Sequence, residues 1–247
     1  MEDSVGIAVI IATFFLAGTV KGVVGLGLPA ISVGVLTAFI GLTEAMTLAT
    51  IPAFLTNLWQ AYSGDNGGVI VRRIWPFLLL ATATVWFGSL ALTRIDQRYL
   101  SALLGVLLAL YAMVSLVGLR LFVPERLEMP VAIAVGALNG IFTGMTGAFS
   151  FPGVLYLQAL GLGKDDLVQA MGMLFALSSA ALGLSLAGGG FMDVGRAGAS
   201  VLAMVPVAAG LAAGTRIRRR LSERAFRRLF FWSLLVLGIF IVAEAIR

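Results

Sequence analysis

The chain has 247 residues, of which 60% are apolar and only 12% are charged. A soluble domain carries roughly 25% charged residues, and a fold of this size could not hide so much apolar surface from water. The composition therefore excludes an ordinary soluble domain, a disordered chain and a disulfide-stapled secreted module. It predicts an integral membrane protein.

Two absences and one charge cluster narrow the chemistry. The chain has neither Cys nor His, so thiolate nucleophiles, Ser-His triads, Cys- or His-ligated zinc and haem-His sites are excluded. We expect no enzyme activity, no bound metal and no cofactor. Seven of the 17 basic residues lie within 216–228 beside apolar segments, which favours a cytosolic flank on the lipid bilayer over contact with nucleic acid.

Apolar segments of membrane-spanning length occur throughout the chain. A helix crosses the hydrocarbon core with about 17–25 apolar residues. The segments are 5–21, 24–42, 45–62, 75–92, 99–119, 130–145, 149–162, 167–187, 198–215 and 229–246. We therefore expect an all-α membrane protein with ten helical segments, some of them broken. The alternative is eight crossings, in which 24–42 and 149–162 enter the membrane and return on the same side.

Loop charges set the expected orientation, because cytoplasmic loops carry an excess of Lys and Arg. With ten crossings and the N-terminus outside, 12 loop basic residues are inside and four are outside. With eight crossings the tally is ten against six, so the first arrangement is favoured. Both arrangements place the N- and C-termini outside the cell inner membrane and residues 216–228 in the cytoplasm.

The two halves of the chain resemble each other. Matches at an offset of 122 are Gly18 with Gly140, Gly22 with Gly144 and Gly25 with Gly147, and a shift to 126 matches Gly88 with Gly214. The pattern predicts two repeats, 1–123 and 124–247, in one transmembrane domain. Five crossings in each repeat would make the halves inverted, whereas four crossings and a dip would make them parallel. The sequence leaves both open.

Each half also interrupts its apolar run with Gly-x-x-Gly and a following Pro, in residues 21–29 and 143–152. Gly costs about 1 kcal/mol and Pro about 3 kcal/mol in a helix, so these segments predict helix breaks. Unwound backbone inside a membrane is tolerated only where it is buried in protein or lines a wet cavity, and its free N–H groups suit an anion. Paired breaks favour a transport site, with close helix packing as the alternative.

Polar residues near the breaks are candidates for binding. Lys21 is the only basic residue well inside an apolar segment, and we interpret it as a counter-charge for an anion, with snorkelling to the interface as the alternative. Amides and hydroxyls donate hydrogen bonds to oxyanions, although they also join helices. The candidate substrate-binding residues are Lys21, Gly22, Gly25, Asn57, Asn139, Thr143, Gly144, Thr146, Gly147 and Ser179. No carboxylate lies mid-span, which argues against a buried acidic proton relay.

Residues 18–29 and, more clearly, 139–152 carry a resemblance to the TauE/SafE family, often called sulfite exporters. The junctions at 41–45 and 163–167 fit as well. The family's motif residues fall here on Gly22, Gly25 and Pro29, and on Gly144, Gly147 and Pro152. The resemblance implies a bacterial inner-membrane permease that moves small sulfur-containing anions outward, with neither enzyme activity nor cofactor.

We therefore expect an exporter of sulfite or of organosulfonates such as sulfoacetate. It would work by alternating access at a site between the two Gly-rich breaks. The alternatives are a transporter of another small organic anion and a non-transporting membrane anchor subunit. The sequence leaves homo-oligomer formation open.

Overall fold

The computed structural model describes residues 2–119, 121–218 and 223–247, and these residues form helices and connections without any strand. In chain order the helices are α1 (Glu2–Val24), α2 (Leu28–Ile40), α3 (Leu42–Tyr62), α4 (Gly67–Ala83), α5 (Val85–Ser89), α6 (Ala91–Arg94), α7 (Gln97–Val117), α8 (Glu125–Thr146), α9 (Gly153–Ala159), α10 (Lys164–Gly188), α11 (Val194–Leu202), α12 (Met204–Arg218) and α13 (Glu223–Ile246). The predicted all-α class is confirmed.

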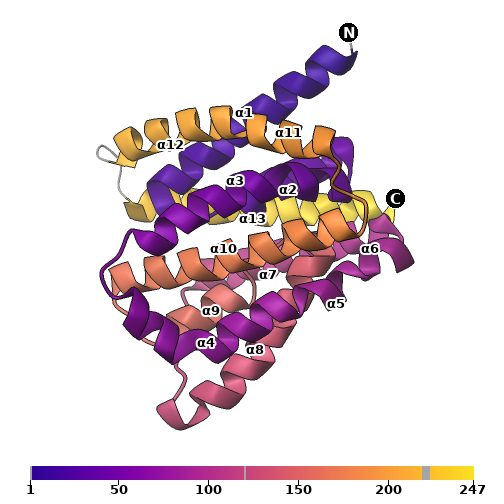
Figure 1. The fold of residues 1–247 in the computed structure, drawn as a ribbon. Coiled ribbons are helices and arrows are strands. Elements are labelled where there is room, and N and C mark those ends of the chain that lie inside the picture. Colours follow the sequence, from indigo (N-terminus) through magenta and orange to yellow (C-terminus); the bar gives the residue numbers. More distant parts are fainter. Residues whose placement is uncertain (1, 120, 219–222) are drawn as a thin grey trace.

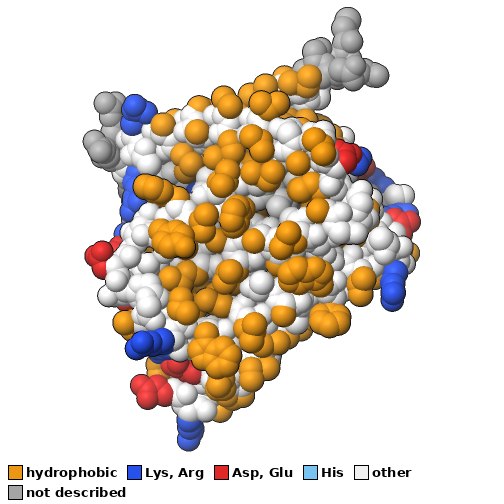
Figure 2. Space-filling view, viewed as in Figure 1, with side chains coloured by type: hydrophobic (Ala, Val, Ile, Leu, Met, Phe, Trp, Pro, Cys, Tyr) orange, Lys and Arg blue, Asp and Glu red, His pale blue; other side chains and the backbone are white. Residues whose placement is uncertain are grey.

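Seven helical rods of the described chain are long and apolar enough to cross a bilayer, when α4–α6 and α11–α12 each count as one rod. Large apolar side chains face outward, among them Trp59 at 77% and Phe87 at 70% exposure. In Figure 2 the hydrophobic side chains cover the middle of the surface, and the charged ones gather at the two ends of the helices. Lipid accepts such a surface and water does not, so the protein is a multi-pass integral membrane protein.

Three predicted segments differ from the helices observed. Segment 75–92 is part of a rod that starts at Gly67 and bends near Thr84 and Leu90, whereas segment 149–162 contains only the seven-residue α9. The polar connection predicted at 216–228 is mostly helical, because α12 continues to Arg218 and α13 begins at Glu223; residues 219–222 lie outside the described residues. Basic side chains interact favourably with the C-terminal end of a helix, so the charges of 216–218 do not end α12.

Helix directions follow from contacts between residues far apart in sequence. Gly172 of α10 lies against Gln60 and Ala61 of α3, whereas Gly183 lies against Thr50, so these two helices are antiparallel. The same reasoning makes α7 and α13 antiparallel, since Gly105 faces 238–242 and Tyr111 packs edge-on against Phe231. In Figure 1 both termini lie at the right, which we call the terminal end, and the α3–α4 turn lies at the left, which we call the α3–α4 end.

Two further helix pairs touch through glycines at matched positions. A Cβ at Gly22 of α1 would lie 2.7 Å from the carbonyl oxygen of Leu211 in α12, and one at Gly144 of α8 would lie 2.1 Å from that of Val85 in α5. Gly18 with Val207 and Gly140 with Ala81 are a second matched set. The glycines differ by 122 positions and their partners by 126. The division into two repeats stays a prediction, which these contacts favour.

Candidate functional site

The first predicted break lies between α1 and α2. Helix α1 ends at Val24, and Gly25 and Gly27 follow with φ angles of 81° and 103°. These positive φ angles disfavour residues with a Cβ, so glycine allows the chain to leave the helix here. Pro29 lies in the first turn of α2, where its fixed φ suits a helix and its missing N–H removes no helical bond. The Gly–Pro break is therefore confirmed in this half.

Lys21 occupies the last turn of α1 and is only 6% exposed. Its Nζ donates a hydrogen bond to Oδ1 of Asn57, a fully buried residue of α3. Among the described residues, no carboxylate forms an ion pair with Lys21. Nδ2 of Asn57 is buried without a hydrogen-bond partner in the described part of the chain. An ammonium without a counter-charge and an unpaired amide are both costly to bury, so together they suit an incoming anion.

A cavity of about 540 Å³ lies beside Lys21 at the α3–α4 end. Its α3 wall includes Thr56, Gln60 and Ser63, which share one helix face because they are four and three positions apart. Thr215, in the last turn of α12, lies on the opposite wall. Gly22 and Gly25 line the cavity too, so the structure brings these two candidates together with Lys21.

The second break follows α8, where Gly147 has a φ angle of 69°. Its polar neighbours bind the backbone of the break itself. Oδ1 of Asn139 accepts the N–H of Gly153 at 2.9 Å, and the Thr146 hydroxyl accepts the N–H of Ala148 at 3.2 Å. The Thr143 hydroxyl donates to the Ala148 carbonyl at 3.3 Å. These contacts satisfy backbone groups that no helix pairs, which is a structural task inside a membrane.

No residue of the second break lines the Lys21 cavity, and the expectation of a single site between the two breaks stays a prediction. A Cβ at Gly147 would lie 2.9 Å from Met46, near the start of α3. Lys21 instead binds Asn57, near the end of α3. These α3 residues are 11 positions apart, about 16 Å along a helix. Nδ2 of Asn139 is buried without a partner among the described residues, as Nδ2 of Asn57 is, so each break has one unpaired amide, and the buried cation lies at the first.

Three other candidates have packing contacts. Gly22 and Gly144 lie inside continuous helix and touch the backbone of α12 and α5, and Ser179 donates its hydroxyl to the carbonyl of Ala176 within α10 at 3.1 Å. Glycine at these positions permits close helix approach, and a hydroxyl bonded to its own helix removes a buried unpaired group. Their binding roles stay predictions.

A second hollow, of about 430 Å³, lies at the terminal end. Ser89 and Ser185 line it, and their hydroxyls are hydrogen-bonded to each other. By the offsets of 126 and 122 these residues correspond to Thr215 and Ser63 of the Lys21 cavity. There the Thr215 hydroxyl donates to the Ala212 carbonyl at 3.0 Å and the Ser63 hydroxyl to Trp59 at 2.7 Å. The residues at these matched positions are therefore hydrogen-bonded to each other at the terminal end, whereas at the α3–α4 end each bonds within its own helix.

Ion pairs add a link between α3 and α11 at the terminal end. The Arg196 guanidinium donates to Glu44 at 2.6 Å, and it also pairs with Asp193 at 3.2 Å. Asp193 accepts the backbone N–H of Arg196 as well, and this bond, followed by the guanidinium charge, holds the pKa of the Asp193 carboxyl below its ordinary value. All three side chains are well exposed, so the pairs orient the ends of helices more than they stabilise the fold.

The polar wall of the cavity was not predicted from the sequence as one continuous surface. Thr56 and Gln60 are visible as polar residues in an apolar segment, and their spacing, continued by Ser63, is the signal of a common face. Thr215 carries no such signal, because it approaches α3 only through the packing of α12 on α1.

The family described as sulfite exporter TauE/SafE matches residues 10–241 of the chain. No curated protein and no solved structure matches it. The match covers both helix breaks, the Lys21 cavity and the hollow at the terminal end. A family of membrane exporters agrees with the multi-pass fold and with a buried, unpaired cation beside a cavity. The chain therefore belongs to the TauE/SafE sulfite exporter family.

Proposed function

We propose that the protein exports a small sulfur-containing anion, sulfite or an organosulfonate such as sulfoacetate, without altering it chemically. The observation that carries the proposal is the buried Lys21, bonded to Asn57 and lining a cavity without a carboxylate partner in the described chain. The family's description as sulfite exporters supports the substrate class.

The cavity offers a sulfonate one cation, because Lys21 lines it and supplies the charge. Asn57 does not line the cavity but lies directly behind Lys21, and its amide Nδ2 is the unpaired neutral donor. On the cavity wall the Thr56 hydroxyl already donates to the Pro52 carbonyl at 2.7 Å and the Gln60 amide to the Val168 carbonyl at 2.8 Å. Charge-assisted hydrogen bonds contribute about 1.5–3 kcal/mol each, roughly twice a neutral bond. We propose that the ammonium selects for negative charge and that the amide orients the oxygens of the bound group.

Alternating access is the proposed mechanism, and the two hollows support it. The terminal hollow is bridged by the Ser89–Ser185 hydrogen bond, while the matched pair, Thr215 and Ser63, stays apart beside the open Lys21 cavity. In the opposite state the bridge would open and the matched pair would close. The structure would then correspond to the conformation that loads substrate from the α3–α4 end.

Helix directions support ten crossings with inverted halves. If α2 and the segment around α9 both re-entered, three crossings would lie between α3 and α10, and these two helices would be parallel. Their contacts make them antiparallel, as do those of α7 with α13. We therefore propose five crossings per half, a plan common among secondary transporters.

We place the α3–α4 end on the cytoplasmic side of the inner membrane and both termini on the outside, because Lys and Arg concentrate in the loops of the α3–α4 end. The inside-negative membrane potential then assists anion export, by about 2.3 kcal/mol per charge for each 100 mV. An exporter that loads at the cytoplasmic cavity therefore gains a driving force without a buried acidic relay.

The test is counterflow of labelled sulfoacetate and sulfite in proteoliposomes. Lys21→Met removes the charge and keeps the side-chain length, and Lys164→Met makes the same change at the chain's other lysine. Loss of one charge-assisted bond predicts a rise in KM of about 10- to 100-fold for Lys21→Met and little change for Lys164→Met. Taurine and acetate test other small anions and zwitterions. An equal KM for Lys21→Met and wild type, at equal protein levels, would refute the assigned site.

A further inference from the structure

A separate cavity, of about 690 Å³, lies where the end of α7, the last turn of α9 and the first turns of α13 meet. None of its lining residues belongs to the Lys21 cavity. Its polar groups are Ser115, Gln158, Arg227 and Arg228, and the rest of the lining is mainly apolar. It lies at the α3–α4 end, because α13 starts opposite to the terminal end.

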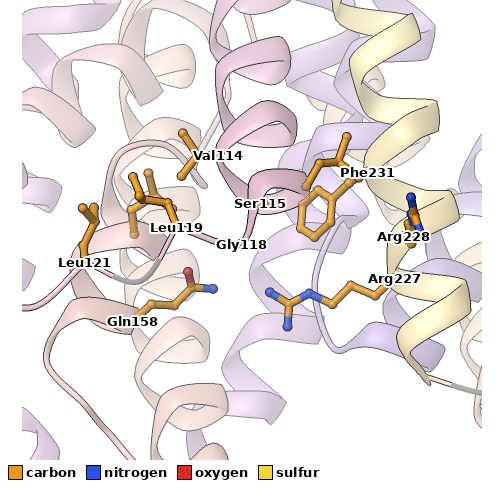
Figure 3. Close-up of a pocket in the computed structure, with 11 residues that line it drawn as sticks. Val114, Ser115, Gly118, Leu119, Leu121, Gln158, Arg227, Arg228 and Phe231 are labelled. Atoms are coloured by element: carbon orange, nitrogen blue, oxygen red, sulfur yellow. The ribbon is translucent and has the colours of Figure 1, made fainter.

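The two arginines are available to a ligand. Arg227 lies over the ring of Phe231, 5.6 Å from its centre, and no ion pair in the described part of the chain involves Arg227 or Arg228. In Figure 3 the Arg227 guanidinium and the Gln158 amide point toward each other from opposite sides of the cavity. A guanidinium held by an aromatic ring keeps its N–H donors free for planar recognition of phosphate.

The apolar part of the cavity indicates which anion fits. Leu119 and Leu121, in the connection between α7 and α8, are 57% and 48% exposed, and Val114 and Leu155 continue the wall. A small soluble anion gains nothing from such a wall. A phospholipid places its phosphate against the arginines and the first part of its acyl chains against the leucines, and basic pockets between helices on the cytoplasmic side bind such head groups.

We propose that this cavity binds the phosphate group of an anionic phospholipid of the inner leaflet. Arg227 and Arg228 hold the charge, Gln158 donates to a phosphate oxygen, and the leucines contact the chains. The lipid would join α13 to α7 and α9, which otherwise enclose an open polar space. The choice of leaflet rests on the proposed orientation, whereas the site itself is independent of the proposed transport site.

Thermal unfolding of the detergent-purified protein tests the proposal, because a ligand that binds the native state raises the midpoint. The probes are phosphatidylglycerol, phosphatidylcholine and inorganic phosphate. The variant is Arg227→Gln/Arg228→Gln, and its matched control is Arg216→Gln/Arg218→Gln, which removes two charges from exposed positions at the end of α12. We expect phosphatidylglycerol to stabilise wild type and control, and the variant to need at least a fivefold higher lipid concentration.

Three results would overturn the proposal: equal stabilisation by phosphatidylcholine, equal stabilisation by inorganic phosphate, or an equal loss in the control variant. The first result would show that the cavity does not distinguish an anionic lipid from a zwitterionic one. The second would assign the cavity to a soluble anion, and the third would show that anionic lipid is attracted to the whole basic segment. Gln158→Leu, which keeps every charge, gives a second test if the double variant does not fold. We expect it to lower the number of phosphatidylglycerol molecules retained in native mass spectrometry, and unchanged retention would contradict the site.

Discussion

Replacing Gly88 by alanine tests how closely the helices approach. A Cβ at Gly88 in α5 would lie 2.1 Å from the carbonyl oxygen of Ile141 in α8 and 3.0 Å from its Cα. Ordinary contact begins at 3.4 Å, so α5 and α8 would have to separate by about 1.3 Å. Backbone cannot rotate away as a side chain can. The substitution therefore disturbs the whole α5–α8 contact.

Two opposing effects set the magnitude. Overpacking costs about 1–3 kcal/mol, whereas alanine in place of glycine within a helix gains about 1 kcal/mol. Gly88→Ala should therefore lower the free energy of unfolding by about 0–2 kcal/mol, or lower Tm by about 0–8 °C for a chain of this size. Gly198 of α11 has no heavy atom within 4 Å of its Cβ position, so Gly198→Ala keeps only the gain. Its Tm should rise by about 2–4 °C.

The assay is tryptophan fluorescence during heating of the purified protein in detergent. Both variants make the same chemical change, so their difference isolates the contact with α8. If Gly88→Ala stabilises the protein as much as Gly198→Ala does, the close approach of α5 to α8 is wrong. The matched glycine contacts that favour the division into two repeats would then lose their support.

Three further predictions concern the two ends of the molecule. Ser89→Ala removes the bond to Ser185, and the loss of about 0.5–1.5 kcal/mol should raise the apparent KM for substrate at the α3–α4 side by about 2- to 10-fold, whereas an unchanged KM would contradict the proposed closure. Glu44→Gln breaks the exposed pair with Arg196 and should cost under about 1 kcal/mol in thermal unfolding, with the difference shrinking at high salt; a larger loss would mean the pair is not a surface one. Arg216→Cys creates the only thiol of the chain, and an impermeant maleimide should label it in inverted vesicles; labelling in intact cells would reverse the proposed orientation.

The sequence pattern was sufficient for the fold class and for both breaks, because glycine and proline act on the backbone locally. It did not indicate where the breaks begin. Gly22 and Gly144 resemble parts of unwound segments in the sequence, yet both remain helical, and their helices end two residues later, at Val24 and Thr146. Whether a glycine ends a helix or admits a neighbouring backbone depends on the neighbour, which a local pattern does not contain.

The sequence indicated which residues belong to the candidate site better than it indicated which of them contact each other. Lys21 and Asn57 were both named, but their contact spans 36 positions and follows from the packing of α2 against both α1 and α3. Asn139 was named as a ligand; its Oδ1 accepts the backbone N–H of Gly153, whereas its Nδ2 is buried without a partner in the described chain, so its binding role stays a prediction. A buried amide near a break suits either task, so the residue type alone cannot decide between substrate and backbone.

The glycine contacts between α1 and α12, and between α8 and the α4–α5 rod, have a mechanical consequence. Where a carbonyl fills the space above a glycine, one helix cannot slide along the other without a collision at every turn. Each helix pair should therefore move as one rigid unit, and conformational change during a transport cycle should occur at the non-helical segments 25–27 and 147–152. A covalent cross-link within a helix pair should leave turnover intact, and a cross-link across one of these segments should stop it.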